Sequence, residues 1–165
     1  MHARETLIDA EHAAFITGAV SIGVAGRNRE RLPSLTRGVG CRVAADRSRV
    51  YVLVGAEQSR EVLADIRDNG MIAVVFSQPS THRTVQFKAD DACVEALDDA
   101  DLLIVERYRQ AFVAHLSALG YSELAVRTLI DCPAYDLVAI GFSPCAAFTQ
   151  TPGPQAGMPL SRVVP

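Results

Sequence analysis

The chain has 165 residues, of which 49% are hydrophobic and 21% charged, with a formal net charge of -3 and no tryptophan. This composition predicts one globular domain over residues 1–165, large enough to bury a continuous core. The negative charge and the lack of a basic run argue against a nucleic-acid-binding protein. No apolar run reaches membrane-spanning length, and the charged N-terminus lacks a signal-peptide core, so a cytoplasmic location is expected.

The first half of the chain predicts helices and strands in an order that keeps most strands adjacent. Apolar spacing indicates a short helix over 5–15, with Leu7, Ile8 and Phe15 near one face. β-prone runs then predict strands over 20–24, 33–43 and 50–54, a helix over 57–68, and strands over 71–76 and 84–87, the last extending toward 95. Asn69-Gly70 is a typical stop for the helix that precedes it.

The second half begins with a long predicted helix whose first turn is capped by Asp98, Asp99 and Asp101. Its predicted apolar stripe runs from Leu102 to Leu119. A short helix over 122–130 and a strand over 135–142 follow. Proline and glycine are frequent after Thr149, so the tail from about residue 150 is expected to be extended or mobile.

Neighbouring strands favour an antiparallel sheet, since a parallel doubly wound sheet would alternate strands with helices. The predicted fold class is therefore α+β: a small antiparallel barrel with flanking helices. The four cysteines contain no C-x-x-C pair and are expected to be reduced. The histidines have no metal-ligand spacing, so no metal site is predicted.

Pro33–Arg42 is the first of three segments that could supply ligand groups. Strand alternation would place Arg37, Val39 and Cys41 on one face, and Gly38, Gly40 and Arg42 on the other. Glycines in a strand allow a ligand to approach the backbone closely. The alternative is a strand bent by glycine with solvated arginines.

The other two segments combine hydroxyls with cations. Ser59 and Arg60 stand at a helix start, where free amides favour an anion, although Ser59 could be only a cap and Arg60 only a surface cation. Ser80–Arg83 is a loop between two strands that could hold an anionic ligand or be a simple polar hairpin loop. In an antiparallel barrel, we expect the three segments to converge on one groove that suits a phosphorylated cofactor.

These motifs together resemble a known family. The pattern P-S-x-x-R-x-V, a strand, S-R before a helix that ends in Asn, another strand and R-x-V is similar to the pyridoxamine 5′-phosphate oxidase-like flavin-binding split barrels. The resemblance covers roughly residues 15–95. It implies an antiparallel split β-barrel that forms a homodimer and holds FMN at the dimer interface.

Site residues follow from the resemblance position by position. Arg37, Val39 and Arg42 match the family's R-x-V-L-L-K strand, with Arg42 in place of the lysine. Val54 and Gly55 match backbone contacts at the end of the next strand.

Ser59 and Arg60 match the S-R of a phosphate-binding S-R-K motif, in which Glu61 replaces the lysine. Counting back from Asn69 instead shifts the register by one and places Arg60 at the serine. In either register Arg60 is the favoured phosphate ligand, with Arg37 beside it.

Arg83-Thr84-Val85 resembles the family's R-Q-V, whose glutamine contacts the flavin ring. Thr84 takes that position, and Gln86 on the same strand face is the alternative ring contact. The resemblance also implies that Thr81 donates a hydrogen bond and that Arg83 stabilises the reduced flavin. His82 is the one near-neutral acid or base in these segments, but no catalytic residue is assigned.

The chain departs from the true oxidases at its end. It has no tryptophan, and its last residues, SRVVP, do not supply the W-x-x-x-R-L-x-P type signature that contributes to substrate binding. The resemblance therefore predicts an FMN-dependent oxidoreductase with an unassigned small-molecule substrate, NAD(P)H being one electron donor to test. The alternatives are a split barrel that binds F420 or haem, with His115 as an axial ligand to consider, or a flavin-binding sensor or storage module without enzymatic activity.

Overall fold

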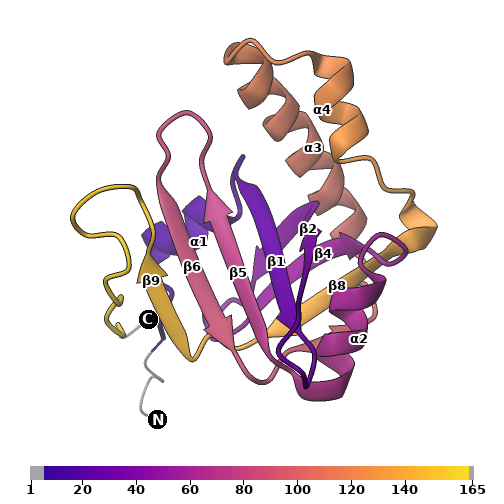
Figure 1. Ribbon diagram of the computed structural model, residues 1–165. Helices are drawn as coiled ribbons and strands as arrows, with labels where there is room; N and C mark the ends of the chain where they lie inside the picture. The colour runs from indigo at the N-terminus through magenta and orange to yellow at the C-terminus, as the bar shows by residue number, and fades with distance from the viewer. Residues whose placement is uncertain (1–5, 164–165) are drawn as a thin grey trace.

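A computed structural model describes residues 6–163, which form two antiparallel sheets and four α-helices (Figure 1). In chain order the elements are α1 (Ala10–Ile16), β1 (Ser21–Arg27), β2 (Pro33–Arg37), β3 (Gly40–Val43), β4 (Val50–Gly55), α2 (Arg60–Asn69), β5 (Ile72–Ser77), β6 (Thr84–Ala89), β7 (Cys93–Glu95), α3 (Asp101–Ala118), α4 (Glu123–Leu129), a 3₁₀ turn (Ala134–Asp136), β8 (Leu137–Phe142) and β9 (Ala146–Thr149).

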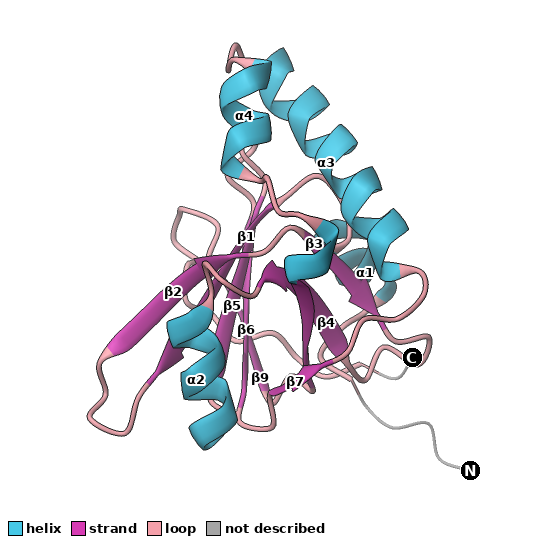
Figure 2. Ribbon diagram, turned by 90° about the vertical axis from the view of Figure 1, so that its right-hand side faces the viewer, coloured by secondary structure: helices cyan, strands magenta, loops and turns pink. Residues whose placement is uncertain are grey.

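The first sheet has the strand order β2-β1-β5-β6-β9 and the second the order β3-β4-β8-β7. Every pairing is antiparallel, which confirms the predicted α+β class. Figure 1 shows one face of the five-stranded sheet uncovered, while the four-stranded sheet lies behind it. Figure 2 shows α3 running beside β3, and the α3–α4 hairpin projecting beyond the ends of the strands.

The core lies between the two sheets. Strict alternation along β5 and β6 turns Phe76 and Phe87 inward, where both are fully buried and their rings meet edge to face at 6.1 Å. The alternate residues of β1, β5 and β6 point to the uncovered side, which we call the outer face. This alternation separates a hydrophobic core from a face that is open to ligands or partners.

The strand predicted over 33–43 is two strands, because the chain bends at Gly38. The Gly38 amide donates to the Ile22 carbonyl at 2.9 Å, and a Cβ there would lie 2.7 Å from Ile22 Cγ2. β2 therefore belongs to one sheet and β3 to the other. The prediction that Arg37 and Val39 share a face is wrong, since Val39 is fully buried and Arg37 lies on the outer face.

Both ends of the chain differ from expectation. Leu7 and Ile8 precede α1 instead of lying on it, because Asp9 caps the helix by accepting from the His12 amide at 2.6 Å. Residue 5, where this helix was predicted to begin, lies outside the described residues. At the other end, the structure contains the strand β9, which the sequence did not predict.

The tail after β9 forms backbone hydrogen bonds with that strand. It turns back so that the Thr149 amide donates to the Met158 carbonyl at 3.0 Å, and the Leu160 amide to Ala147 at 2.8 Å. Two residues of the predicted apolar stripe are exposed: Leu102 in α3 and Leu119, which follows the helix as its C-cap. No helix within residues 6–163 is both long and apolar enough to cross a membrane.

Candidate functional site

The register of the five-stranded sheet arranges the outer face in rows. Ser21, Ser77 and Thr84 are in register on β1, β5 and β6 and form what we call the hydroxyl row. Ser77 Oγ and Thr84 Oγ1 are 2.8 Å apart. The next row toward the middle of the sheet contains Arg37, Gly23, Val75, Gln86 and Phe148. Polar groups thus gather at one end of an uncovered sheet face.

Arg37 is the last residue of β2 and lies in the second of these rows, in register with Gly23. Its Nη1 donates to Ser21 Oγ at 2.9 Å, and no carboxylate among the described residues forms an ion pair with it. Arg37 and Ser21 line a cavity of about 300 Å³. Apolar residues of the α3–α4 hairpin, including Phe112, Leu116 and Leu129, line this cavity too. An unpaired cation in partly apolar surroundings is well placed to bind an anion, because low local dielectric strengthens the attraction.

Arg42, only one strand further on, is in the opposite situation. Its Nε donates to the carboxylate of Asp101 at 2.7 Å, and its guanidinium lies 3.7 Å from the centre of the Tyr51 ring. The Asp101 side chain is completely buried and also accepts from the Asp98 amide at 2.7 Å. Burial works against the charged guanidinium, but the hydrogen bond to Asp101 prevails and raises the pKa of Arg42.

The N-terminal end of α3 therefore differs from the prediction. The helix starts at Asp101 without a side-chain cap, because the Asp101 carboxylate faces Arg42 and the loop before the helix. The sequence predicted three capping aspartates, of which the structure uses one as a buried counter-ion.

Ser59 and Arg60 lie at the start of α2, and neither lines the cavity that contains Arg37. Ser59 is buried, and its Oγ lies 2.8 Å from Thr36 Oγ1 on the inward face of β2. Arg60 is exposed and lies 3.4 Å from the Glu57 carboxylate, beside Glu61. The Glu57 amide already donates to Asp136 at 3.1 Å. The start of α2 is therefore surrounded by carboxylates of the chain itself.

The β5–β6 loop forms a tight turn. The backbone of His82 has a φ of 59°, in the left-handed region, and its amide donates to the Gln78 carbonyl. Thr81 Oγ1 donates to Gln78 Oε1 at 2.9 Å. Arg83 pairs with Glu11 at 2.8 Å and lies 4.4 Å from the Phe15 ring. These contacts connect the loop to α1.

The remaining predicted site residues divide between the outer face and the core. Gln86 lies on the outer face and accepts from the Gln150 side chain at 3.3 Å. Val39 and Val54 are fully buried, so they offer a ligand only backbone groups. Gly55 pairs with Leu137, and a Cβ there would lie 2.9 Å from Cys132 Sγ.

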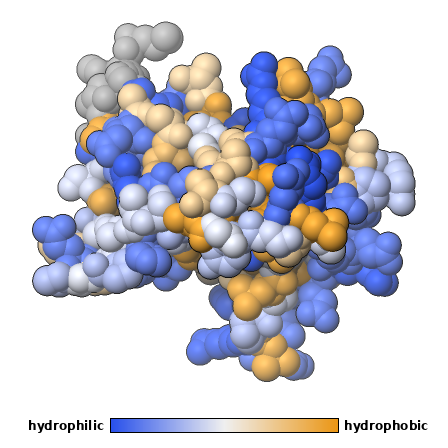
Figure 3. Space-filling view, turned by 90° about the horizontal axis from the view of Figure 1, so that it is seen from above, coloured by the Kyte–Doolittle hydropathy of each residue, from blue (hydrophilic) through white to orange (hydrophobic). Residues whose placement is uncertain are grey.

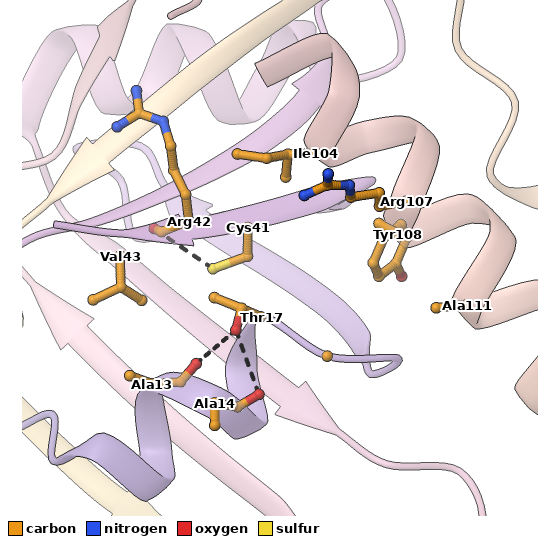
Figure 4. Close-up of a pocket in the computed structure, with 11 residues that line it drawn as sticks. Ala13, Ala14, Thr17, Cys41, Arg42, Val43, Ile104, Arg107, Tyr108 and Ala111 are labelled. Atoms are coloured by element: carbon orange, nitrogen blue, oxygen red, sulfur yellow. Dashed lines mark hydrogen bonds between the residues drawn. The ribbon is translucent and has the colours of Figure 1, made fainter. Parts of the chain in front are cut away.

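A second cavity, of about 550 Å³, lies over β3 between α1 and α3 (Figure 4). We call it the β3 groove. β3 pairs only with β4, so its other edge carries no described strand partner. Cys41 and Arg107 line the groove, while the Arg42 guanidinium points away from Cys41 and Thr17. Burial strongly raises the pKa of Cys41, which makes it an inert thiol.

Of the predicted site residues, the structure brings Arg37, Thr84 and Gln86 onto one sheet face. It does not bring Arg42 or Arg60 into the same cavity within this single chain. Ser21 and Ser77 were missed, because their alignment beside Thr84 depends on strand register rather than on any local motif. No cluster of three or more metal-ligating side chains occurs in the described part of the chain.

No protein-family model and no curated protein matches the sequence. Solved structures do match. Group A Streptococcus HupZ is 17% identical, with a TM-score of 0.55 over 91% of this chain and 99% of that chain. A "putative pyridoxamine 5′-phosphate oxidase" of Lactobacillus delbrueckii is 16% identical, with a TM-score of 0.52 over 86% and 93%. These similarities show that the chain has the pyridoxamine 5′-phosphate oxidase-like split-barrel fold, as predicted.

Proposed function

We propose that this chain binds FMN and, with the flavin bound, acts as an oxidoreductase whose substrate is still to be assigned. The observation that carries the proposal is Arg37, a guanidinium that has no carboxylate partner within residues 6–163 and lies next to the hydroxyl row of a split barrel. Arg42, Arg60 and Arg83 are the other arginines that the resemblance assigns to this site, and each of them contacts a carboxylate.

The residues around Arg37 fit the phosphate end of FMN. A guanidinium can donate two parallel hydrogen bonds to a phosphate, and the Ser21 hydroxyl adds a third donor beside it. The apolar side chains of Phe112 and Leu116 limit the water that competes for the anion. Exposed carboxylates next to Arg60 would instead repel a phosphate, so Arg37 is the principal phosphate ligand in this proposal.

The rest of the outer face would contact the remainder of the cofactor. β2 and β6 are separated by three strand spacings, about 14 Å at ~4.8 Å each. An extended FMN molecule, from its phosphate through the ribityl chain to the ring, can cover that span, which would place the ring near Thr84 and Gln86. When bound, the flavin supplies the hydride or electron chemistry. The protein residues bind it, orient its ring through amide and hydroxyl groups, and shield it from water.

We also propose that two copies enclose the cofactor, because the single chain leaves its site open. The outer face is uncovered in Figure 1. Seen from above, hydrophobic residues are interspersed with hydrophilic ones over the upper surface (Figure 3). Exposed apolar residues on the α3–α4 hairpin include Leu124 at 76% and Tyr121 at 61%. A homodimer would cover this hairpin and the hydroxyl-row end of the outer face, and light scattering of the purified protein would report its mass.

The test of the cofactor starts from the purified protein. We expect it to be yellow, to release FMN on denaturation and to change the FMN absorbance spectrum when titrated. A colourless protein that leaves the FMN spectrum unchanged would contradict the proposal, and a Soret band would support haem instead. Oxidation of NAD(P)H by the flavin-loaded protein, compared with free FMN, would separate an enzyme from a flavin store.

A further inference from the structure

A separate cavity opens on the outer face at the end away from the hydroxyl row. Its volume is about 540 Å³, within the range of small-molecule sites. The floor consists of small side chains: Ala25 is in register with Ala73, and Lys88 lies in register between Ala73 and Ala146. A flat apolar floor of this kind gains free energy when a ligand covers it.

Three cations surround this floor, and we call the cavity the cation-rimmed pocket. Arg27, Arg31 and Lys88 line it, whereas Asp90 is its one acidic lining residue. None of the three cations forms an ion pair with a described carboxylate. Arg27 donates only to a backbone carbonyl, at 3.4 Å, and Lys88 Nζ lies 5.3 Å from the centre of the Phe148 ring.

The position of Arg31 is fixed by the turn that joins β1 to β2. Its amide donates to the Asn28 carbonyl at 3.0 Å, and its backbone has a φ of 66°. A left-handed φ is uncommon for a residue other than glycine. A left-handed residue is usual at the end of a short hairpin loop, so the turn itself accounts for this conformation and places Arg31 beside the pocket.

We propose that the cation-rimmed pocket binds a small organic anion with an apolar body, its head group between Arg31 and Lys88 and its body on the alanine floor. The net charge of the lining favours an anion, and the floor favours hydrocarbon over water. Carboxylates and phosphate monoesters share this chemistry. The pocket shares no residue with the proposed FMN site, and it lies one row further along the sheet, since Lys88 follows Gln86 by two residues, about 7 Å along β6.

Calorimetric titration of the full chain with decanoate and with decyl phosphate tests the pocket. Binding of decanoate alone, decyl phosphate alone or both supports the proposal and identifies the head group. In the double variant Arg31→Gln/Lys88→Gln, affinity should fall by about tenfold or more, because two charge-assisted contacts are lost. Arg29→Gln is the matched control: it removes a cation from the same turn, but one that pairs with Asp68 at 2.9 Å.

Two cysteines provide a second measurement that does not depend on calorimetry. Cys145 is exposed and lines the pocket, whereas Cys93 is exposed on β7 of the other sheet. Decanoate should slow maleimide labelling of Cys145, followed by mass spectrometry, and leave labelling of Cys93 unchanged. Ala73→Phe, which fills the floor without changing charge, should remove this protection.

Three results would overturn the proposal. The first is binding of decanol or inorganic phosphate as tight as that of decanoate, which would show that the head group and the hydrocarbon body are not recognised together. The second is a double variant that binds decanoate as tightly as the original chain. The third is a double variant that changes only the dimer mass, which would show that a second copy of the chain occupies the pocket.

Discussion

Arg37 and Arg42 lie on consecutive strands, and both match arginine or lysine positions of the same motif, yet their surroundings are opposite. Arg42 is neutralised by the buried Asp101 carboxylate and stacked on Tyr51. Arg37 contacts one hydroxyl and lies on an open sheet face. The comparison teaches that a cation becomes a ligand-binding group only where the fold leaves it without a counter-ion. Arg42 is therefore primarily structural, and Arg37 is available for a ligand.

The largest expected effect concerns the buried counter-ion. Asp101→Ala should destabilise the protein by about 3 kcal/mol, because it leaves Arg42 without its partner and frees the Asp98 amide. Urea unfolding followed by circular dichroism measures this. Asp99→Ala, which removes an exposed neighbouring carboxylate, should change stability by less than about 0.5 kcal/mol. Equal effects of the two variants would mean that Arg42 does not need Asp101.

A smaller effect is expected at the bend that separates the two arginines. Gly38→Ala should cost about 1–3 kcal/mol, since the new Cβ would lie 2.7 Å from Ile22 Cγ2 and 2.8 Å from Val52 Cγ1. Gly23→Ala is the control, because nothing lies within 4 Å of a Cβ there. If thermal unfolding showed both variants to be equally stable, close packing at Gly38 would not be what bends the strand.

Arg60 should behave like an ordinary surface cation. It is exposed and paired with Glu57, so Arg60→Ala should weaken FMN binding less than about threefold, the range of a surface charge contact. Flavin fluorescence quenching at fixed ionic strength measures the affinity. A tenfold loss of FMN affinity would indicate that the phosphate binds at the start of α2, where the sequence predicted it.

The smallest effect concerns a third arginine, Arg49, which donates to Glu95 at 2.7 Å. This hydrogen bond lowers the pKa of Glu95 below its usual value of 4.5. The pair therefore contributes stability above that unfolded-state pKa, and the contribution is lost as the pH falls through the lower folded-state pKa. Glu95→Gln should cost less than about 1 kcal/mol at pH 7 and almost nothing near pH 2 in urea unfolding. A cost that is the same at both pH values would rule out this linkage.

Most of the secondary structure could be predicted, because local signals determine it. The Asn69-Gly70 stop is confirmed, with Gly70 at a φ of 68° closing α2. Ser122 caps α4 by accepting from the Ala125 amide. The bend at Gly38 and the strand β9 could not be predicted, since each depends on partners far away in the chain: Val52 packs against Gly38, and β6 pairs with β9.

The candidate site was predictable only in part. The resemblance, taken position by position, indicated Arg37, Thr84 and Gln86, which do share the outer face. Nothing local indicated that Asp101, 59 positions away, would neutralise Arg42. Nor could spacing reveal the hydroxyl row, whose members meet only through strand register. Counter-ions and register are long-range properties, and they decide which cations remain available.

The central claim is that Arg37 holds the phosphate of FMN, and the most direct test compares FMN with riboflavin, which lacks that phosphate. The account predicts that the original chain and Arg60→Ala both bind FMN about tenfold or more tighter than riboflavin. In Arg37→Ala this preference should disappear, while affinity for riboflavin stays the same. If Arg37→Ala kept the full preference for FMN, the phosphate would bind elsewhere and the claim would be wrong.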